Sequence, residues 1–170
     1  AARIVRDGTS TAIRVADGWH EMTHITLSSG ELFQGAVMGV LRRVRNMKAG
    51  RKELYSPPKT GAWDRHIEGA LGELALAKHL NVFIADHTDR KCPDVGDVDV
   101  RMSTYANAHL IVHPDDPDDR DIWLVTGFLG EYVIRGWMNS KDAKQQKWWG
   151  GPDNERPSCY FVPQGELDNG

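Results

Sequence analysis

The spacing of the apolar residues changes near residue 81, and this change divides the chain into a helical part and a β-rich part. Before it, apolar residues recur at helical spacing in two segments, one from a candidate cap at Ser28 to Gly50 and one from Asp64 to Leu80. After it, β-rich runs separated by Gly, Pro and Asp occupy 82–85, 98–104, 110–112, 122–128, 132–138 and 160–162. Residues 141–149 fit a short helix. Helices followed by strands predict an α+β or mixed α/β fold.

The length of 170 residues favours one domain, because a single core of about 100–150 residues is the commonest size. We expect a strand and helix region at 1–62, a core at 63–140, and a C-terminal helix and strand at 141–170. No apolar run approaches the roughly 18 residues of a membrane span, and no basic stretch leads into an apolar run near Ala1. Cys92 and Cys159 have no metal or disulfide-framework spacing, so we expect a reduced, cytoplasmic protein without a membrane partner.

The charge is unevenly distributed along the chain. The 21 Lys and Arg against 24 Asp and Glu give a net charge of −3, but 42–52 holds six cations and no acid. Five aspartates then fall within 86–99, and five more within 115–121, which we interpret as a loop. Each block alone is typical of a solvated surface.

Glu73 stands out in the second predicted helix. At 100° per residue it falls between Ala77 and Leu80, at the flank of the apolar arc. A carboxylate directed toward the interior is costly unless it is paired or binds a cation. Taken alone, Glu73 favours the interpretation as a salt-bridged helix glutamate.

The run at 98–104 alternates, so that Asp99 and Arg101 face one way and Val100 the other. Asp94 lies just upstream and could converge with them on one sheet face, with the helix that carries Glu73 packed against it. Asp97 is a competing candidate for the place of Asp94. Carboxylates around one point suit Mg²⁺ or Mn²⁺ rather than zinc. An acidic surface hairpin is the alternative interpretation of this pattern.

These residues resemble the PD-(D/E)XK nuclease superfamily, which has the restriction-endonuclease-like fold, and in particular its compact phage-type members. The resemblance rests on the segment 69–75 with its Glu73, on Pro93-Asp94, on Asp99-Val100-Arg101 and on the segment 109–112. It covers about residues 64–138. It implies a central mixed β-sheet flanked by helices, to which the first helix would be an N-terminal extension.

The resemblance also implies metal-dependent hydrolysis of phosphodiester bonds in DNA. Glu73, Asp94, Asp99 and the carbonyl of Val100 would bind Mg²⁺ or Mn²⁺, which activates water. Arg101 stands where the superfamily has lysine. Arginine cannot act as a base, but it can contact the scissile phosphate. The implied catalytic set is therefore Glu73, Asp94, Asp99 and Arg101.

The basic block acquires a second interpretation, because a nuclease needs cations that hold DNA beside its acidic centre. The candidate DNA contacts are Arg42, Arg43, Arg45, Lys48, Arg51 and Lys52. A homodimer is compatible with such a chain. Two other functions remain open: a DNA-binding protein of this fold without catalysis, and an interaction protein whose acidic segments bind a basic partner.

Two further features are weaker candidates. Trp148 and Trp149 follow a basic stretch and could stack on bases, although paired tryptophans more often close a small core. His109 is a minor candidate for a proton donor or phosphate contact.

Overall fold

The computed structural model describes residues 4–7, 10–15, 18–51, 62–84, 92–150 and 158–168, and the side chains of 23–51, 63–84, 92–150 and 158–168. The larger sheet has the order β1-β2-β3-β7-β6-β4 and consists of β1 (Ile4–Asp7), β2 (Ser10–Val15), β3 (Gly18–Thr26), β7 (Glu131–Asn139), β6 (Asp121–Phe128) and β4 (Asp99–Ser103). Strands β4 and β6 are parallel, and the other neighbours are antiparallel. The sheet is therefore mixed, and β4 is one of its two edge strands.

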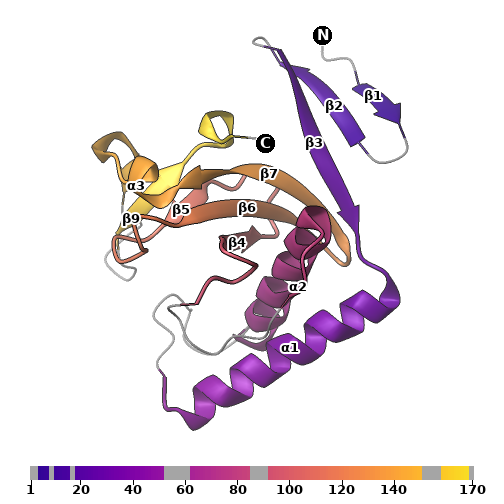
Figure 1. Ribbon diagram of the computed structural model, residues 1–170, viewed down its shortest axis with the longest axis vertical. Helices are drawn as coiled ribbons and strands as arrows, with labels where there is room; N and C mark the ends of the chain where they lie inside the picture. The colour runs from indigo at the N-terminus through magenta and orange to yellow at the C-terminus, as the bar shows by residue number, and fades with distance from the viewer. Residues whose placement is uncertain are drawn as a thin grey trace.

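Two long helices lie together below the larger sheet in Figure 1, and α2 (Ala62–Leu80) lies between the sheet and α1 (Ser29–Lys48). A smaller sheet has the order β5-β9-β8 and is formed by β5 (Leu110–Val112), β9 (Cys159–Val162) and β8 (Trp149–Gly150). Two short helical turns, α3 (Ser140–Ala143) and η1 (Gln146–Trp148), join β7 to β8, and a third, η2 (Gln164–Glu166), follows β9. A mixed sheet flanked by helices confirms the predicted α+β fold class.

Strand β6 separates two hydrophobic cores. Its residues Trp123 and Val125 belong to the core that includes the apolar face of α2. The alternate residues Ile122 and Leu124 belong to a second core with β5 and β9. A strand covered on both faces reads as a continuous apolar run, which is how 122–125 reads in the sequence.

The helix starts and ends follow local sequence signals. Ser28 caps α1 as predicted, since its hydroxyl accepts from the Glu31 N–H and the Glu31 carboxylate accepts from the Ser28 N–H at 2.6 Å. Lys78 near the end of α2 reaches back to the same Glu31 carboxylate at 2.9 Å and to the Thr26 carbonyl. Asn81 ends α2 with a positive φ of 53°. Both predicted helices are confirmed.

The two helices cross closely because α1 presents glycine to α2. The buried residues of α1 are Gly35, Met38 and Gly39. A Cβ built at Gly39 would lie 2.5 Å from the Cα of Ile67. Large apolar side chains on other faces of α1 remain exposed: Phe33, Val37, Val40, Leu41 and Met47.

Two predictions about the elements are wrong. Residues 82–84 form no strand, and Ala85 lies outside the described residues. The predicted helix at 141–149 is divided into α3, η1 and the start of β8. Strands β1, β2 and β3 lie within the strand and helix region expected at 1–62, and β3 pairs with β7 and so extends the central sheet. Among the described helices, none has both the length and the apolar content of a membrane span.

Candidate functional site

The two faces of β4 carry different chemistry, as the sequence alternation predicts. Val100 and Met102 pack in the core under α2, and a Cβ built at Gly72 of α2 would lie 2.5 Å from the Met102 Cγ. Asp99 and Arg101 are in register with Ile122 and Leu124 of β6, so they lie on the face of the second core. The expectation that the helix with Glu73 packs against the Asp99 and Arg101 face is therefore wrong.

Glu73 lies on the helix side of the sheet and is 7% exposed. Its Oε1 accepts from Nη1 of Arg42 on α1 at 2.5 Å. The interpretation of Glu73 as a salt-bridged helix glutamate is thus realised in the structure. Removing either member of such a pair would leave a buried charge without this partner. The pair therefore ties the two helices together at this point.

Asp94 lies at the free edge of β4, the edge that has no strand partner among the described residues. Its Oδ2 accepts from the backbone N–H of Val100 at 3.0 Å. Burial raises the pKa of Asp94, and the charge of Asp99 adds to this effect, while Arg101 and Arg42 oppose it. Asp94 is thus close to charges from both faces of the sheet.

The carbonyl of Val100 faces the same free edge as Asp94. In a strand, the N–H and C=O groups of one residue point to the same side, and the Val100 N–H points to Asp94. Asp97 is exposed in the turn before β4 and Val95 is buried, so this turn directs Asp94 rather than Asp97 to the strand edge. Two carboxylates and a carbonyl, from Asp94, Asp99 and Val100, therefore gather around the start of β4.

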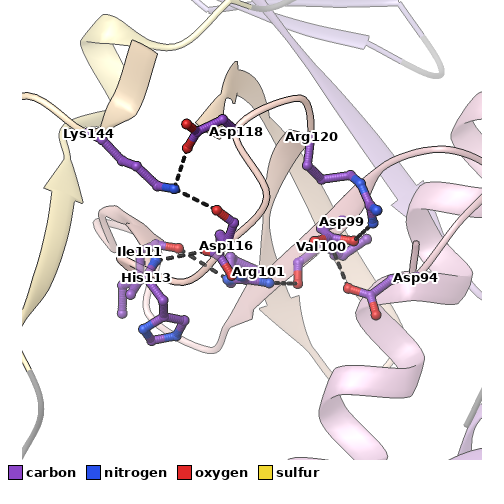
Figure 2. A network of polar contacts seen from close by, with 10 residues as sticks. All are labelled: Asp94, Asp99, Val100, Arg101, Ile111, His113, Asp116, Asp118, Arg120 and Lys144. Atoms are coloured by element: carbon purple, nitrogen blue, oxygen red, sulfur yellow. Dashed lines mark hydrogen bonds and ion pairs between the residues drawn. The ribbon is translucent and has the colours of Figure 1, made fainter. Parts of the chain in front are cut away.

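Both charged residues of β4 are engaged by the loop that joins β5 to β6 (Figure 2). Asp99 Oδ1 accepts from Arg120 Nη1 at 2.7 Å, and the side chains of both residues are 13% exposed. Arg101 extends toward Asp116, whose Oδ2 accepts from its Nη2 at 2.7 Å. The loop that the sequence identifies only as acidic thus provides a partner for each charge.

The sequence offers no reason to place Asp116, Arg120 or Lys144 beside β4. Lys144 donates to the Asp116 carbonyl at 2.5 Å and to the Asp118 carboxylate at 2.6 Å. The partners are far apart in the sequence: Asp99 and Arg120 are separated by 21 residues, and Asp116 and Lys144 by 28. The visible signal was the placement of Arg120 and five aspartates in one short segment, which does not specify partners.

The donor atoms near β4 determine whether a metal ion fits. In the described part of the chain, no group of three or more His, Cys, Asp or Glu is placed to hold a metal ion. Glu73 is not gathered with Asp94 and Asp99. The set that does share the strand edge contains only carboxylate and carbonyl oxygens, which are the donors Mg²⁺ and Mn²⁺ prefer. The fit therefore rests on Asp94, Asp99 and the Val100 carbonyl, without Glu73.

The basic block lies along the last turns of α1 and just beyond it. Arg42 turns inward to Glu73, and Arg43 is half-buried. The exposed cations are Arg45, Lys48 and Arg51. Lys52 lies outside the described residues. The predicted contacts of this block with DNA therefore depend on its exposed cations.

The remaining candidates divide between core and surface. Trp148 is 8% exposed in the second core, which confirms its predicted core role. Trp149 is 41% exposed and packs edge-on against Tyr160, with ring centroids 4.8 Å apart. His109 is exposed, whereas burial and the charge of Arg101 lower the pKa of His113.

No family model, curated protein or solved structure matches this chain. The resemblance to the PD-(D/E)XK superfamily therefore stays a prediction from short motifs. The arrangement of Asp94, Asp99 and Val100 at β4 is the structural feature that bears on function.

Proposed function

We propose that this protein is a metal-dependent nuclease that hydrolyses phosphodiester bonds in DNA at the free edge of β4. The observation that carries the proposal is the contact of the Asp94 carboxylate with the Val100 N–H at 3.0 Å. This contact brings a half-buried acid beside a strand-edge carbonyl and next to Asp99. The raised pKa of Asp94, caused by burial and by the Asp99 charge, is the electrostatic setting that a bound cation would relieve.

The side chains would divide the work as follows. Asp94, Asp99 and the Val100 carbonyl would hold Mg²⁺ or Mn²⁺, which supplies an activated water and neutralises phosphoryl charge when bound. Arg101 follows on the same strand face as Asp99 and would contact the phosphate. In the hydrolysis, the water oxygen forms a bond to phosphorus and one phosphate ester bond breaks. The departing sugar oxygen ends as a hydroxyl.

Two ion pairs have to adjust if a metal binds. Arg120 holds Asp99 at 2.7 Å and would share or release this carboxylate. Glu73 is paired with Arg42, so in this arrangement it joins the two helices rather than acting as a ligand. The exposed Arg45, Lys48 and Arg51 would bind DNA phosphates without reading the sequence.

The same ion pairs favour a second candidate, a DNA-binding protein of this architecture without catalysis. Arginines already neutralise two of the three carboxylates predicted to bind metal. A third candidate is an interaction protein that binds a basic partner through the acidic loop, where Asp115, Asp118 and Asp119 are exposed. The loop carboxylate of Asp116 is directed to Arg101 and is 13% exposed.

The test incubates the protein with supercoiled, linear and single-stranded DNA in Mg²⁺ or Mn²⁺, with and without EDTA. The proposal predicts cleavage that EDTA abolishes and that Asp99→Asn loses. DNA binding by electrophoretic shift at several salt concentrations is measured alongside. Salt-sensitive binding without cleavage in any metal would overturn the nuclease and favour the second candidate. Neither binding nor cleavage would leave only the interaction protein.

A further inference from the structure

The guanidinium of Arg101 is held by three separate acceptors. Its Nε donates to the Ile111 carbonyl at 3.1 Å, its Nη2 to Asp116 Oδ2 at 2.7 Å, and its Nη1 to the Val100 carbonyl at a longer 3.4 Å. Figure 2 shows these contacts converging from β4, β5 and the following loop. An arginine has five guanidinium N–H groups, so two are left after these contacts within the described part of the chain.

Asp116 is itself fixed in the loop. The Oδ2 atom that accepts from Arg101 also accepts from the His113 N–H at 2.8 Å. In return, the Asp116 N–H donates to the His113 carbonyl at 3.1 Å. This local turn sets the direction of the carboxylate. The side chain of Asp116 is 13% exposed and that of Arg101 is 22% exposed, so the pair is largely screened from water.

Lys144 fastens this turn to the C-terminal segment. Its ammonium donates to the Asp116 carbonyl at 2.5 Å, and its side chain is only 16% exposed. The second acceptor, the Asp118 carboxylate, is 68% exposed. Of the two contacts, the one to the Asp116 backbone therefore holds the loop in place, while Asp118 provides a solvated counter-charge.

We propose that Asp116 is a positioning residue that orients Arg101 toward the scissile phosphate, with Lys144 securing the loop that carries it. This inference rests on the proposed nuclease function and adds to it a specific role for the acidic loop. An arginine whose guanidinium is ordered before substrate binds loses less entropy when it contacts a phosphate. The contacts to Ile111 and Asp116 order it, and the two remaining N–H groups are available to the phosphate.

The opposite role for the same contact would be inhibition, with the Asp116 carboxylate occupying Arg101 in place of a phosphate. The two roles predict changes of opposite sign. If Asp116 positions Arg101, its loss lowers the catalytic rate. If it blocks Arg101, its loss raises the rate or tightens substrate binding.

The experiment measures kcat and KM of full-length Asp116→Asn and Lys144→Met on a duplex oligonucleotide in Mg²⁺. Asparagine keeps one acceptor for the loop while it removes the charge. The positioning role predicts that kcat of Asp116→Asn falls by roughly ten- to a hundredfold while KM changes little. Lys144→Met shows a smaller loss in kcat. The control Asp118→Asn retains wild-type kinetics because that carboxylate is exposed.

A second readout does not depend on activity. The side-chain N–H signal of Arg101 in ¹⁵N relaxation measurements reports whether its guanidinium is ordered. The positioning role predicts an ordered Arg101 in the wild type and Asp118→Asn, and a mobile one in Asp116→Asn. If the wild type cleaves no DNA but Arg101 shows this pattern, the nuclease fails and the structural clamp stands. If the wild type cleaves DNA and Asp116→Asn is as fast or faster, the positioning role is overturned.

Discussion

Replacing Gly39 by alanine tests the helix crossing that brings Arg42 to Glu73. Gly39 is buried in α1, three residues before Arg42, where α1 lies against α2. A Cβ there would lie 2.5 Å from the Ile67 Cα and 2.6 Å from the His66 carbonyl oxygen. Both are backbone atoms, which cannot rotate away as a side chain could. The helices would have to separate.

The size of the effect follows from two opposing contributions. Overpacking a buried site costs about 1–3 kcal/mol, and a clash with backbone belongs at the upper end of this range. Alanine in place of glycine in a helix returns about 1 kcal/mol. We therefore expect Gly39→Ala to lower the free energy of unfolding by about 2 kcal/mol.

Gly69 provides the matched control in α2. It is inside the helix, and a Cβ built on it meets nothing within 4 Å. The helix preference then acts alone, and Gly69→Ala should raise the free energy of unfolding by about 0.5–1 kcal/mol. The same substitution thus has opposite signs at the two positions.

Urea unfolding followed by circular dichroism measures both variants. With a slope of about 2 kcal/mol per molar urea, the midpoint of Gly39→Ala should fall by about 1 M and that of Gly69→Ala should rise by a few tenths of a molar. The reasoning is refuted if Gly39→Ala is as stable as the wild type, or if both variants shift in the same direction.

Three further predictions concern charges. Asp94→Asn should stabilise the protein at pH 7 in urea unfolding, because burial raises the pKa of Asp94 and its charged form opposes folding. The gain in stability should vanish below pH 3.8, where the wild-type acid is protonated. A gain that persists below this pH contradicts the proposed cause. The Ser28 N–H and Lys78 lower the pKa of Glu31 to about 2 from 4.5. The contribution of Glu31 to the free energy of unfolding is therefore complete above pH 4.5 and is lost as the pH falls toward 2. Glu31→Gln should flatten the dependence of stability on pH in that window, and an unchanged dependence would count against the contact. Lys48→Ala should weaken DNA binding and reduce the slope of log Kd against log salt by about 1, whereas an unaltered slope would exclude Lys48 from the contact surface.

The sequence predicts well what depends on neighbouring residues. The Ser28 cap, the extent of α2 and the alternation of β4 each follow from a pattern within a few residues. The position of Glu73 at the flank of an apolar arc correctly indicates its burial. Each of these features depends on the spacing of residues within one element, and this spacing can be seen in the sequence.

Periodicity does not specify which element covers each face. It places Asp99 and Arg101 on one face of β4. It does not show that α2 covers the face of Val100, or that the smaller sheet lies on the face of Asp99 and Arg101. The partners of the site charges come from distant segments, as with Arg42 for Glu73 and Arg120 for Asp99. Folding decides which of these charges come close enough to pair. The sequence therefore shows that the basic block and the acidic loop are charged, but it does not show which residues pair.

The most direct test of the β4 site compares DNA cleavage by the wild type, Asp94→Asn and Asp97→Asn in Mg²⁺ or Mn²⁺. The two aspartates lie three residues apart, but only Asp94 contacts the strand edge, while Asp97 is exposed. We predict EDTA-sensitive cleavage by the wild type, a rate within about twofold for Asp97→Asn, and a loss of about a hundredfold or more for Asp94→Asn. Cleavage by Asp94→Asn at the wild-type rate would contradict the assignment of the active site to this edge.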